Sequence, residues 1–199
     1  MAETLVLASA SPSRRKLMEN AGLAFQAVAA NIDERAVERD LLPRDLGPGD
    51  LAVELAAAKA LEVSQRFPTA LVIGCDQTMS LGRRVFHKPA DRTEARSTLS
   101  ALRGETHRLN SSIVLVRGGR ELWRHLSTAD LAMRDFSDAF LECYLDRCGE
   151  KVMESVGCYQ LEGIGIQLFN SITGDYFTIL GLPLLPLLGQ LRTLGEIDG

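Results

Sequence analysis

The sequence predicts an α/β fold in which helices flank a mixed, twisted sheet. Short apolar runs alternate with helix-like segments through the first part of the chain. A Gly-Gly pair at 118–119 then joins two strand-like segments, which indicates a β-hairpin and therefore an antiparallel part of the sheet. No repeat, low-complexity tract or linker divides the 199 residues, so we expect one domain over 1–199.

Two strands and two helices are expected in the N-terminal third of the chain. Ser11 suits a helix N-cap and Pro12 the first helical position, while Gly22 suits the stop. The stretch 31–50 contains two prolines and two glycines among charged residues, which predicts a long loop with one helical turn. Asp50 is expected to cap the helix that follows. The predicted elements are strands at 4–9 and 23–29 and helices at 12–22 and 50–66.

The rest of the chain is expected to add strands, a hairpin and three helices. Gly82 predicts a turn inside an extended segment, and Asp91 with Glu94 forms a capping box for a helix that stops at Gly104. Ser137 is a further N-cap, and the glycine-rich stretch after that helix precedes a last helix. The predicted elements are strands at 71–73, 79–86, 107–116 and 121–134 and helices at 91–104, 137–148 and 184–193.

Composition excludes several classes of protein. The chain is 46% hydrophobic and 24% charged, as in soluble globular proteins. Its net charge of −4 argues against a nucleic-acid partner, which favours a basic surface. No apolar run reaches the roughly 18 residues of a membrane span. The N-terminal apolar run is short and has no basic residues before it, so we expect a cytoplasmic protein without a signal peptide.

The cysteines and glycines fit none of the common cofactor motifs. Four cysteines and three histidines form no C-x-x-C pair and no zinc-binding spacing, so we expect reduced and mostly buried thiols. The glycines between 157 and 181 match neither the dinucleotide-binding G-x-G-x-x-G pattern nor the P-loop. They suit either close backbone approach to a ligand or tight turns.

A candidate anion site lies where the first strand meets the first helix. The helix N-terminus favours an anion there, yet the sequence places Arg14 and Arg15 in the first turn after Ser9. Phosphate binding would explain these arginines, because a guanidinium binds phosphate through two hydrogen bonds. A solvated basic face of an ordinary helix explains them equally well.

Other charged residues could serve the same chemistry. Asp76 follows a buried strand, where a carboxylate can activate water or hold a metal, or simply form a turn. Lys59 lies at the edge of the apolar face of its helix, and Lys88 precedes a proline. The adjacent carboxylates Asp33 and Glu34 suit a hard cation such as Mg²⁺, although such pairs are usually surface charge.

Short distinctive segments lie in order along nearly the whole chain. They are LASASP (7–12), RR (14–15), IDE (32–34), AKA (58–60), IGCDQ (73–77), KPAD (88–91), GETH (104–107), EGIG (162–165), ITGDY (172–176) and GLPL (181–184). In this order they resemble the Maf family of nucleoside triphosphate pyrophosphatases. The resemblance implies a fold like that of inosine triphosphatase-type enzymes, with two lobes around a cleft and often a homodimer.

The resemblance also implies the reaction and the residues that perform it. A nucleoside triphosphate and water would give the monophosphate and pyrophosphate, with Mg²⁺ or Mn²⁺ as cofactor. Asp76 would be the general base, and Glu34 with Asp76 would hold the metal ion. The triphosphate would be bound by a set of polar and cationic residues. These are Ser9, Arg14, Arg15, Lys59 and Lys88.

Three positions are expected to select the base. They are Ser13, Gln77 and Glu162. The dTTP/UTP branch of the family would have Arg, Thr and Gln there, and the 7-methyl-GTP branch an aromatic residue, Gln and Glu. The chain therefore favours a 7-methyl-GTP-like purine, although Ser13 fits neither branch. The resemblance suggests house-cleaning of modified nucleotides as the role.

Two alternatives compete with this interpretation. The family is also associated with arrest of septum formation, so a non-enzymatic nucleotide-binding regulator of cell division is one of them. A phosphohydrolase that releases single phosphates is the other. The complete set of charged residues favours the pyrophosphatase. Asn110-Ser111-Ser112 replaces the more common Tyr-Thr-Gly, which bears on substrate preference.

Overall fold

The computed structural model describes residues 5–198 and divides into two compact units. Unit 1 contains residues 5–77, 110–128 and 175–198 of these, and unit 2 contains residues 78–109 and 129–174. Strands β3, β5 and β6 contribute residues to both units. The strands are β1 (Leu5–Ala8), β2 (Phe25–Ala27), β3 (Leu71–Leu81), β4 (Arg84–Phe86), β5 (Thr106–Arg117), β6 (Arg120–Met133) and β7 (Phe169–Thr173).

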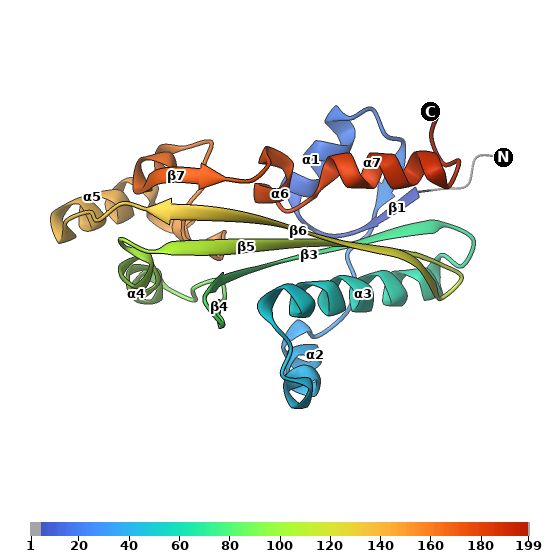
Figure 1. Cartoon of the computed structure of the whole chain (residues 1–199), viewed down its shortest axis with the longest axis horizontal. Coiled ribbons are helices and arrows are strands. Elements are labelled where there is room, and N and C mark those ends of the chain that lie inside the picture. Colours follow the sequence, from blue (N-terminus) through green and yellow to red (C-terminus); the bar gives the residue numbers. More distant parts are fainter. Residues whose placement is uncertain (1–4, 199) are drawn as a thin grey trace. The chain divides into compact units, whose positions relative to one another are not determined.

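The described strands form one mixed, seven-stranded sheet, which confirms the predicted α/β class (Figure 1). Its order is β2-β1-β3-β5-β6-β7, with β4 paired to β3. β1 pairs in parallel with both β2 and β3, whereas the β3–β4 and β6–β7 pairs are antiparallel. The predicted hairpin is also present, because Gly118 and Gly119 both adopt positive φ angles between β5 and β6.

Helices cover both faces of the sheet in unit 1. Alternate residues of β1 point to opposite faces: Leu5 and Leu7 join the core under α1 (Pro12–Asn20) and α7 (Leu184–Thr193), and Val6 and Ala8 join the core under α3 (Pro48–Arg66). Figure 1 shows α3 on one side of β1 and β3 and the other two helices opposite. Because both faces are covered, β1 and the first part of β3 (71–73) are apolar on both faces.

Local signals placed some helices correctly and others only in part. The side chain of Ser11 caps α1 as predicted, and α7 spans its predicted residues. The expectation of a loop with one helical turn at 31–50 is wrong, because the side chain of Asp33 caps an eight-residue helix, α2 (Glu34–Leu41), followed by the 3₁₀ helix η1 (Leu42–Arg44). Asp50 is not the cap of α3 but lies in its first turn, after Gly47 and Pro48.

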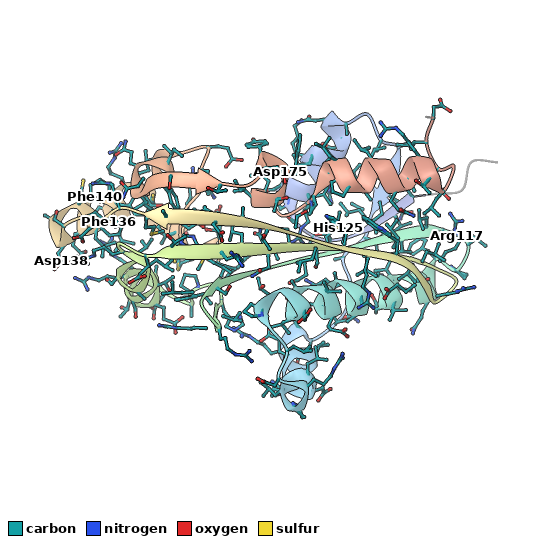
Figure 2. All side chains as sticks on the ribbon, in the orientation of Figure 1. Arg117, His125, Phe136, Asp138, Phe140 and Asp175 are labelled. Atoms are coloured by element: carbon teal, nitrogen blue, oxygen red, sulfur yellow. The ribbon has the colours of Figure 1, made fainter. Side chains whose placement is uncertain are left out.

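Unit 2 contains residues 78–81 of β3, 106–109 of β5 and 129–133 of β6, together with β4, β7 and a group of short helices. Its helices are α4 (Arg92–Leu102), α5 (Asp138–Cys148) and the 3₁₀ helices η2 (Gly149–Met153) and η3 (Ile164–Leu168). Asp91 and Ser137 cap α4 and α5 as predicted. Beside the α5 cap, Phe136 and Phe140 pack with ring centroids 5.7 Å apart (Figure 2).

Two short elements before α7 were not predicted. One is the strand β7 in unit 2, and the other is α6 (Tyr176–Ile179) in unit 1. The side chain of Asp175, labelled in Figure 2, caps α6 by accepting hydrogen bonds from the amides of Phe177 and Thr178. The sequence 169–179 carries no periodicity long enough to distinguish these elements from loop.

A buried histidine makes unit 2 sensitive to acid. His107 is fully buried, and burial lowers its pKa from 6.5 to about 4, although the charge of Asp130 acts in the opposite direction. Between those pH values the unfolded chain binds a proton that the folded protein does not, so stability rises with pH across this window. We expect acidification from pH 7 to pH 4 to cost about 3 kcal/mol through this residue.

Urea unfolding of the wild type and of His107→Gln at pH 7 and pH 4.5 measures this effect. The glutamine side chain does not titrate, so the variant should lose less stability on acidification than the wild type. Other groups contribute equally to both proteins and cancel in the comparison. An identical loss in the two proteins would contradict the assignment.

Candidate functional site

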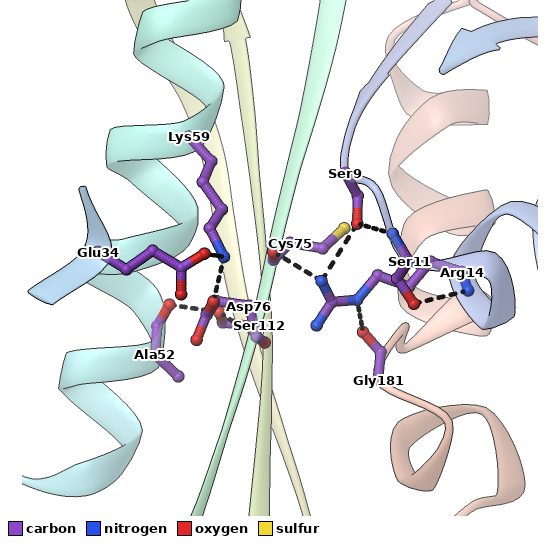
Figure 3. A network of polar contacts seen from close by, with 10 residues as sticks. All are labelled: Ser9, Ser11, Arg14, Glu34, Ala52, Lys59, Cys75, Asp76, Ser112 and Gly181. Atoms are coloured by element: carbon purple, nitrogen blue, oxygen red, sulfur yellow. Dashed lines mark hydrogen bonds and ion pairs between the residues drawn. The ribbon is translucent and has the colours of Figure 1, made fainter. Parts of the chain in front are cut away.

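The centre of unit 1 brings together two carboxylates and a lysine. The Nζ atom of Lys59 lies 2.6 Å from Oδ1 of Asp76 and 2.8 Å from Oε1 of Glu34 (Figure 3). Asp76 comes from β3, Lys59 from α3 and Glu34 from the first turn of α2. The side chains of Asp76 and Lys59 are buried, whereas that of Glu34 is half exposed. The Glu34 end of this cluster is therefore open to solvent.

Asp76 is an internal residue of its strand, contrary to the sequence prediction that it follows the strand. β3 continues from Leu71 to Leu81, so the carboxylate projects from the middle of a paired strand. The sequence could not separate the two cases, because polar residues after an apolar run usually mark its end.

Gly74, two residues before Asp76, sets how closely α3 approaches β3. A Cβ atom on Gly74 would lie only 2.2 Å from the backbone oxygen of Ala56 and 2.7 Å from the Cβ of Ala60. Helix and strand therefore touch through their backbones at this point. Lys59 lies on the same helix between these two alanines, so this contact positions its ammonium group beside Asp76.

Burial and neighbouring charges act in opposite directions on the carboxyl group of Asp76. Burial raises its pKa above the ordinary value, while the charges of Lys59 and Arg14 act in the opposite direction and favour the ionised form. A raised pKa makes a carboxylate a stronger base than an exposed carboxylate. The ammonium group of Lys59 favours its ionised form. This combination suits proton abstraction from water.

Two serines of β5 support this part of β3, a role beyond the effect on substrate preference that their departure from the family pattern suggested. The hydroxyl of Ser112 donates to the backbone oxygen of Ala52, 2.7 Å away, and lies 3.3 Å from the backbone oxygen of Asp76. The hydroxyl of Ser111 donates to the backbone oxygen of Thr178 at 2.7 Å. Both serines are fully buried. The signal for these residues in the sequence was a run of polar residues beside an apolar strand segment, because buried polar groups need hydrogen-bond partners.

Arg14 ties three segments of unit 1 together. Its Nε donates to the backbone oxygen of Gly181 at 2.8 Å, and its Nη1 donates to the backbone oxygen of Cys75 at 3.1 Å and to Oγ of Ser9 at 3.3 Å (Figure 3). A Cβ at Gly181, whose φ is +89°, would lie 3.3 Å from Nε. These contacts join the turn after β1 to β3 and to the turn before α7, so Arg14 positions the backbone here.

The remaining predicted residues of α1 and its approach differ in exposure. Ser9 is buried, and its Oγ also accepts a hydrogen bond from the amide of Ser11. Ser13 and Arg15 are exposed on the first turn of α1. Arg15 is therefore more accessible than Arg14 to an anion from solvent.

Gln77 contacts the segment that forms α6. Its side-chain amide donates to Oγ of Ser111 at 2.7 Å and to the backbone oxygens of Thr178 and Ile179 at 3.0 and 3.2 Å. These donors hold α6 against β3. The predicted role of Gln77 in base selection would therefore include positioning this segment.

Two predicted residues belong to unit 2. Lys88 is exposed in the loop that follows β4, and Glu162 is exposed in the turn before η3. Among the described residues of unit 2, none forms a hydrogen bond or ion pair with either charged group. Both side chains are available to a ligand.

The thiols are not arranged for catalysis. Cys75 and Cys158 are buried, Cys148 is partly exposed and Cys143 is exposed, so the prediction of mostly buried thiols holds for two of the four. Burial raises the pKa of Cys75 to about 11 and that of Cys158 to about 12. Both remain protonated at neutral pH and are poor nucleophiles.

The donor set fits a hard divalent cation that is bound together with phosphate. Among residues 5–198, no three His, Cys, Asp or Glu side chains are grouped as a metal site. Asp76 and Glu34 nevertheless converge on a single cation, the ammonium of Lys59, from two elements. Mg²⁺ commonly binds through one or two carboxylates plus substrate phosphates, and this pair supplies that share of the ligands.

The described helices include none long and apolar enough to cross a membrane.

Comparisons with known proteins identify the family of this chain. The model of the Maf-like protein family matches residues 4–194. A 7-methyl-GTP pyrophosphatase of Rhizobium etli is 61% identical over 199 residues, and one of Brucella abortus is 54% identical over 199 residues, each with both chains covered in full. A nucleoside triphosphate pyrophosphatase of Paramagnetospirillum magneticum is 52% identical over 192 residues, which cover 96% of this chain and 99% of that protein. The predicted resemblance is confirmed, and the chain belongs to the Maf-like protein family.

Proposed function

We propose that this chain hydrolyses a nucleoside triphosphate to the monophosphate and pyrophosphate, with a 7-methyl-GTP-like purine as substrate. The observation that carries the proposal is the buried carboxylate of Asp76, held 2.6 Å from Lys59 beside Glu34. The names of relatives with 61% and 54% identity over the full chain support the same reaction and substrate. The alternatives of a regulator or a single-phosphate hydrolase have no such support.

In the proposed mechanism, Asp76 activates the attacking water. Its carboxylate accepts a proton as the water oxygen bonds to the α-phosphorus, and the bond from that phosphorus to the bridging oxygen breaks. Pyrophosphate leaves with the bridging oxygen, and Asp76 later returns the proton to solvent. Burial raises the pKa of this carboxyl group, which makes its carboxylate a stronger base than an exposed one.

Cationic side chains would balance the charge of the triphosphate. Lys59 already lies at the reacting carboxylate, and the exposed Arg15 and Lys88 can each contact a phosphate oxygen. Ser9 and Arg14 would contribute from the turn after β1, with Arg14 acting largely through its contacts with Ser9, Cys75 and Gly181.

A divalent cation would be held by Glu34 and Asp76. Mg²⁺ or Mn²⁺ bound there supplies neutralisation of phosphate charge. Within the protein, Lys59 must then share its two carboxylate partners with the cation, and the half-exposed Glu34 is the partner with more freedom to move. We infer that the two units together act as one pyrophosphatase domain.

Glu162 gives a physical reason for the purine preference. Its exposed carboxylate can accept hydrogen bonds from N1–H and the N2 amine of guanine. Methylation at N7 puts a positive charge on the base, which a carboxylate attracts more strongly than it attracts a neutral guanine. We propose base-selecting roles for Gln77 and Ser13 as well.

A substrate panel tests the proposal. Purified protein is incubated with Mg²⁺ or Mn²⁺ and 7-methyl-GTP, GTP, dTTP or UTP, and pyrophosphate and single phosphate are measured separately. We expect pyrophosphate release that is fastest with 7-methyl-GTP, and a smaller preference over GTP in Glu162→Gln. Release of single phosphates, or no turnover of any triphosphate by the folded protein, would overturn the proposal.

A further inference from the structure

The turn that carries Glu162 is anchored in the core of unit 2 by the residue three positions earlier. Tyr159 is buried, with its ring 4.8 Å from that of Phe169 in an edge-to-face arrangement. Its Oη lies 2.7 Å from Nε2 of His107 and 4.0 Å from the sulfur of Met79. The hydroxyl of Tyr159 and Nε2 of His107 form a hydrogen bond in either histidine tautomer, so the hydroxyl has a buried partner.

Hydrogen bonds and close contacts constrain the backbone before Tyr159. Oγ of Ser155 donates to the backbone oxygen of Tyr159 at 2.8 Å and accepts a hydrogen bond from its amide at 3.1 Å, which closes a small ring. A Cβ at Gly157 would lie 2.2 Å from the tyrosine ring. Cys158 adopts a left-handed conformation with φ of +60°, and its backbone oxygen accepts a hydrogen bond from Tyr144. This strained backbone persists because its surroundings hold it.

The turn after Tyr159 folds back onto the same residue. The amide of Gly163 donates to the backbone oxygen of Gln160 at 3.2 Å. A Cβ at Gly165 would lie 2.7 Å from that oxygen and 3.0 Å from the Cβ of Tyr159. Both ends of the turn 160–165 therefore rest on Tyr159, while Glu162 between them is exposed.

The hydroxyl of Tyr159 is also the hydrogen-bond partner of a buried histidine. Among residues 5–198, Nδ1 of His107 has no hydrogen-bond partner, so the bond to Tyr159 is the ring's one polar contact. Removal of that hydroxyl leaves an imidazole with neither nitrogen paired in a fully buried site. A buried polar group without a partner is costly, so the surrounding side chains must rearrange.

From these contacts we propose that Tyr159, held by His107, is the positioning residue that sets the selectivity of Glu162 for a 7-methylguanine base. The inference rests on the proposed function, since it concerns how that activity chooses its substrate. Tyr159 acts through the turn and touches no reacting atom. Without this anchor, the Glu162 carboxylate samples several positions. The enzyme then loses more of its preference for the methylated base than of its turnover.

The test compares Tyr159→Phe with two other variants. Leu99→Ala opens a cavity in the buried face of α4 and destabilises the same unit without removing a hydroxyl, which makes it the control for general loss of stability. Glu162→Gln reports directly on the selecting carboxylate. For each protein we measure kcat/KM for 7-methyl-GTP and UTP, and hydrogen–deuterium exchange of the amides of 160–166.

We expect the 7-methyl-GTP to UTP ratio of kcat/KM to fall about 5- to 30-fold in Tyr159→Phe, corresponding to roughly 1–2 kcal/mol. The kcat for UTP should stay within about 3-fold, and amides 160–166 should exchange faster. Leu99→Ala should keep the ratio, because a smaller folded fraction scales both substrates equally.

Two results would overturn the inference. If the ratio falls in Glu162→Gln but is unchanged in Tyr159→Phe, the anchor has no part in selectivity and the proposed function stands. If exchange at 160–166 is the same in Tyr159→Phe as in the wild type, the hydroxyl does not hold the turn. Wild-type protein that hydrolyses none of the triphosphates would overturn both the proposed function and this inference.

Discussion

Asp76→Asn is expected to reduce pyrophosphate release at least about 10³-fold, within the range by which a positioned general base accelerates a reaction. Asparagine has the same shape but cannot accept the proton from water. It also withdraws one of the two carboxylates that converge on Lys59. The fold should persist, because Lys59 keeps its contact with the half-exposed Glu34 and the replaced side chain packs in the same space.

Asp33→Asn is the matched control for this substitution. Asp33 adjoins Glu34, but its side chain accepts a hydrogen bond from the amide of Ala36 as the cap of α2. Asparagine caps helices as well as aspartate does, so turnover should stay within about 2-fold. Initial rates with 7-methyl-GTP and thermal unfolding of both variants give the comparison. Turnover by folded Asp76→Asn close to that of the wild type would exclude Asp76 as the base.

Gly74→Ala is expected to destabilise the protein and to impair catalysis together. The added Cβ would lie 2.2 Å from the backbone oxygen of Ala56, which cannot move without the helix. Overpacking of this kind typically costs about 1–3 kcal/mol, and a backbone contact belongs at the upper end. Displacement of α3 also takes the ammonium of Lys59 away from Asp76. We therefore expect turnover per folded molecule to fall at least about 10-fold.

Gly189→Ala provides the control for a glycine-to-alanine change. Gly189 lies on the exposed side of α7, and a Cβ there meets nothing within 4 Å. Alanine should raise the free energy of unfolding by about 0.5–1 kcal/mol because it favours the helix more than glycine does. Urea unfolding and initial rates measure both variants. Equal stability of Gly74→Ala and Gly189→Ala would show that α3 and β3 are not in backbone contact.

The sequence by itself determined those parts of the fold that depend on neighbours along the chain. Ser11 with Pro12 placed the start of α1, the glycines at 118–119 placed the hairpin, and the last helix has its predicted limits. Caps, turns and helical periodicity all arise from contacts between residues a few positions apart, so they can be recognised locally. α2 was missed because the prolines and glycines of 31–50, which predict a loop, all lie after the last residue of this helix.

The candidate site was predictable as a set of residues but not as an arrangement. The family resemblance named Asp76, Lys59 and Glu34, and only the tertiary structure shows that they meet at one ammonium group. It also changes the interpretation of Arg14, whose partners include the backbone of Gly181, 167 residues away. No pattern within a segment encodes such contacts, because they depend on how closely helices and strands pack. That packing is set here by the absence of a side chain at Gly74.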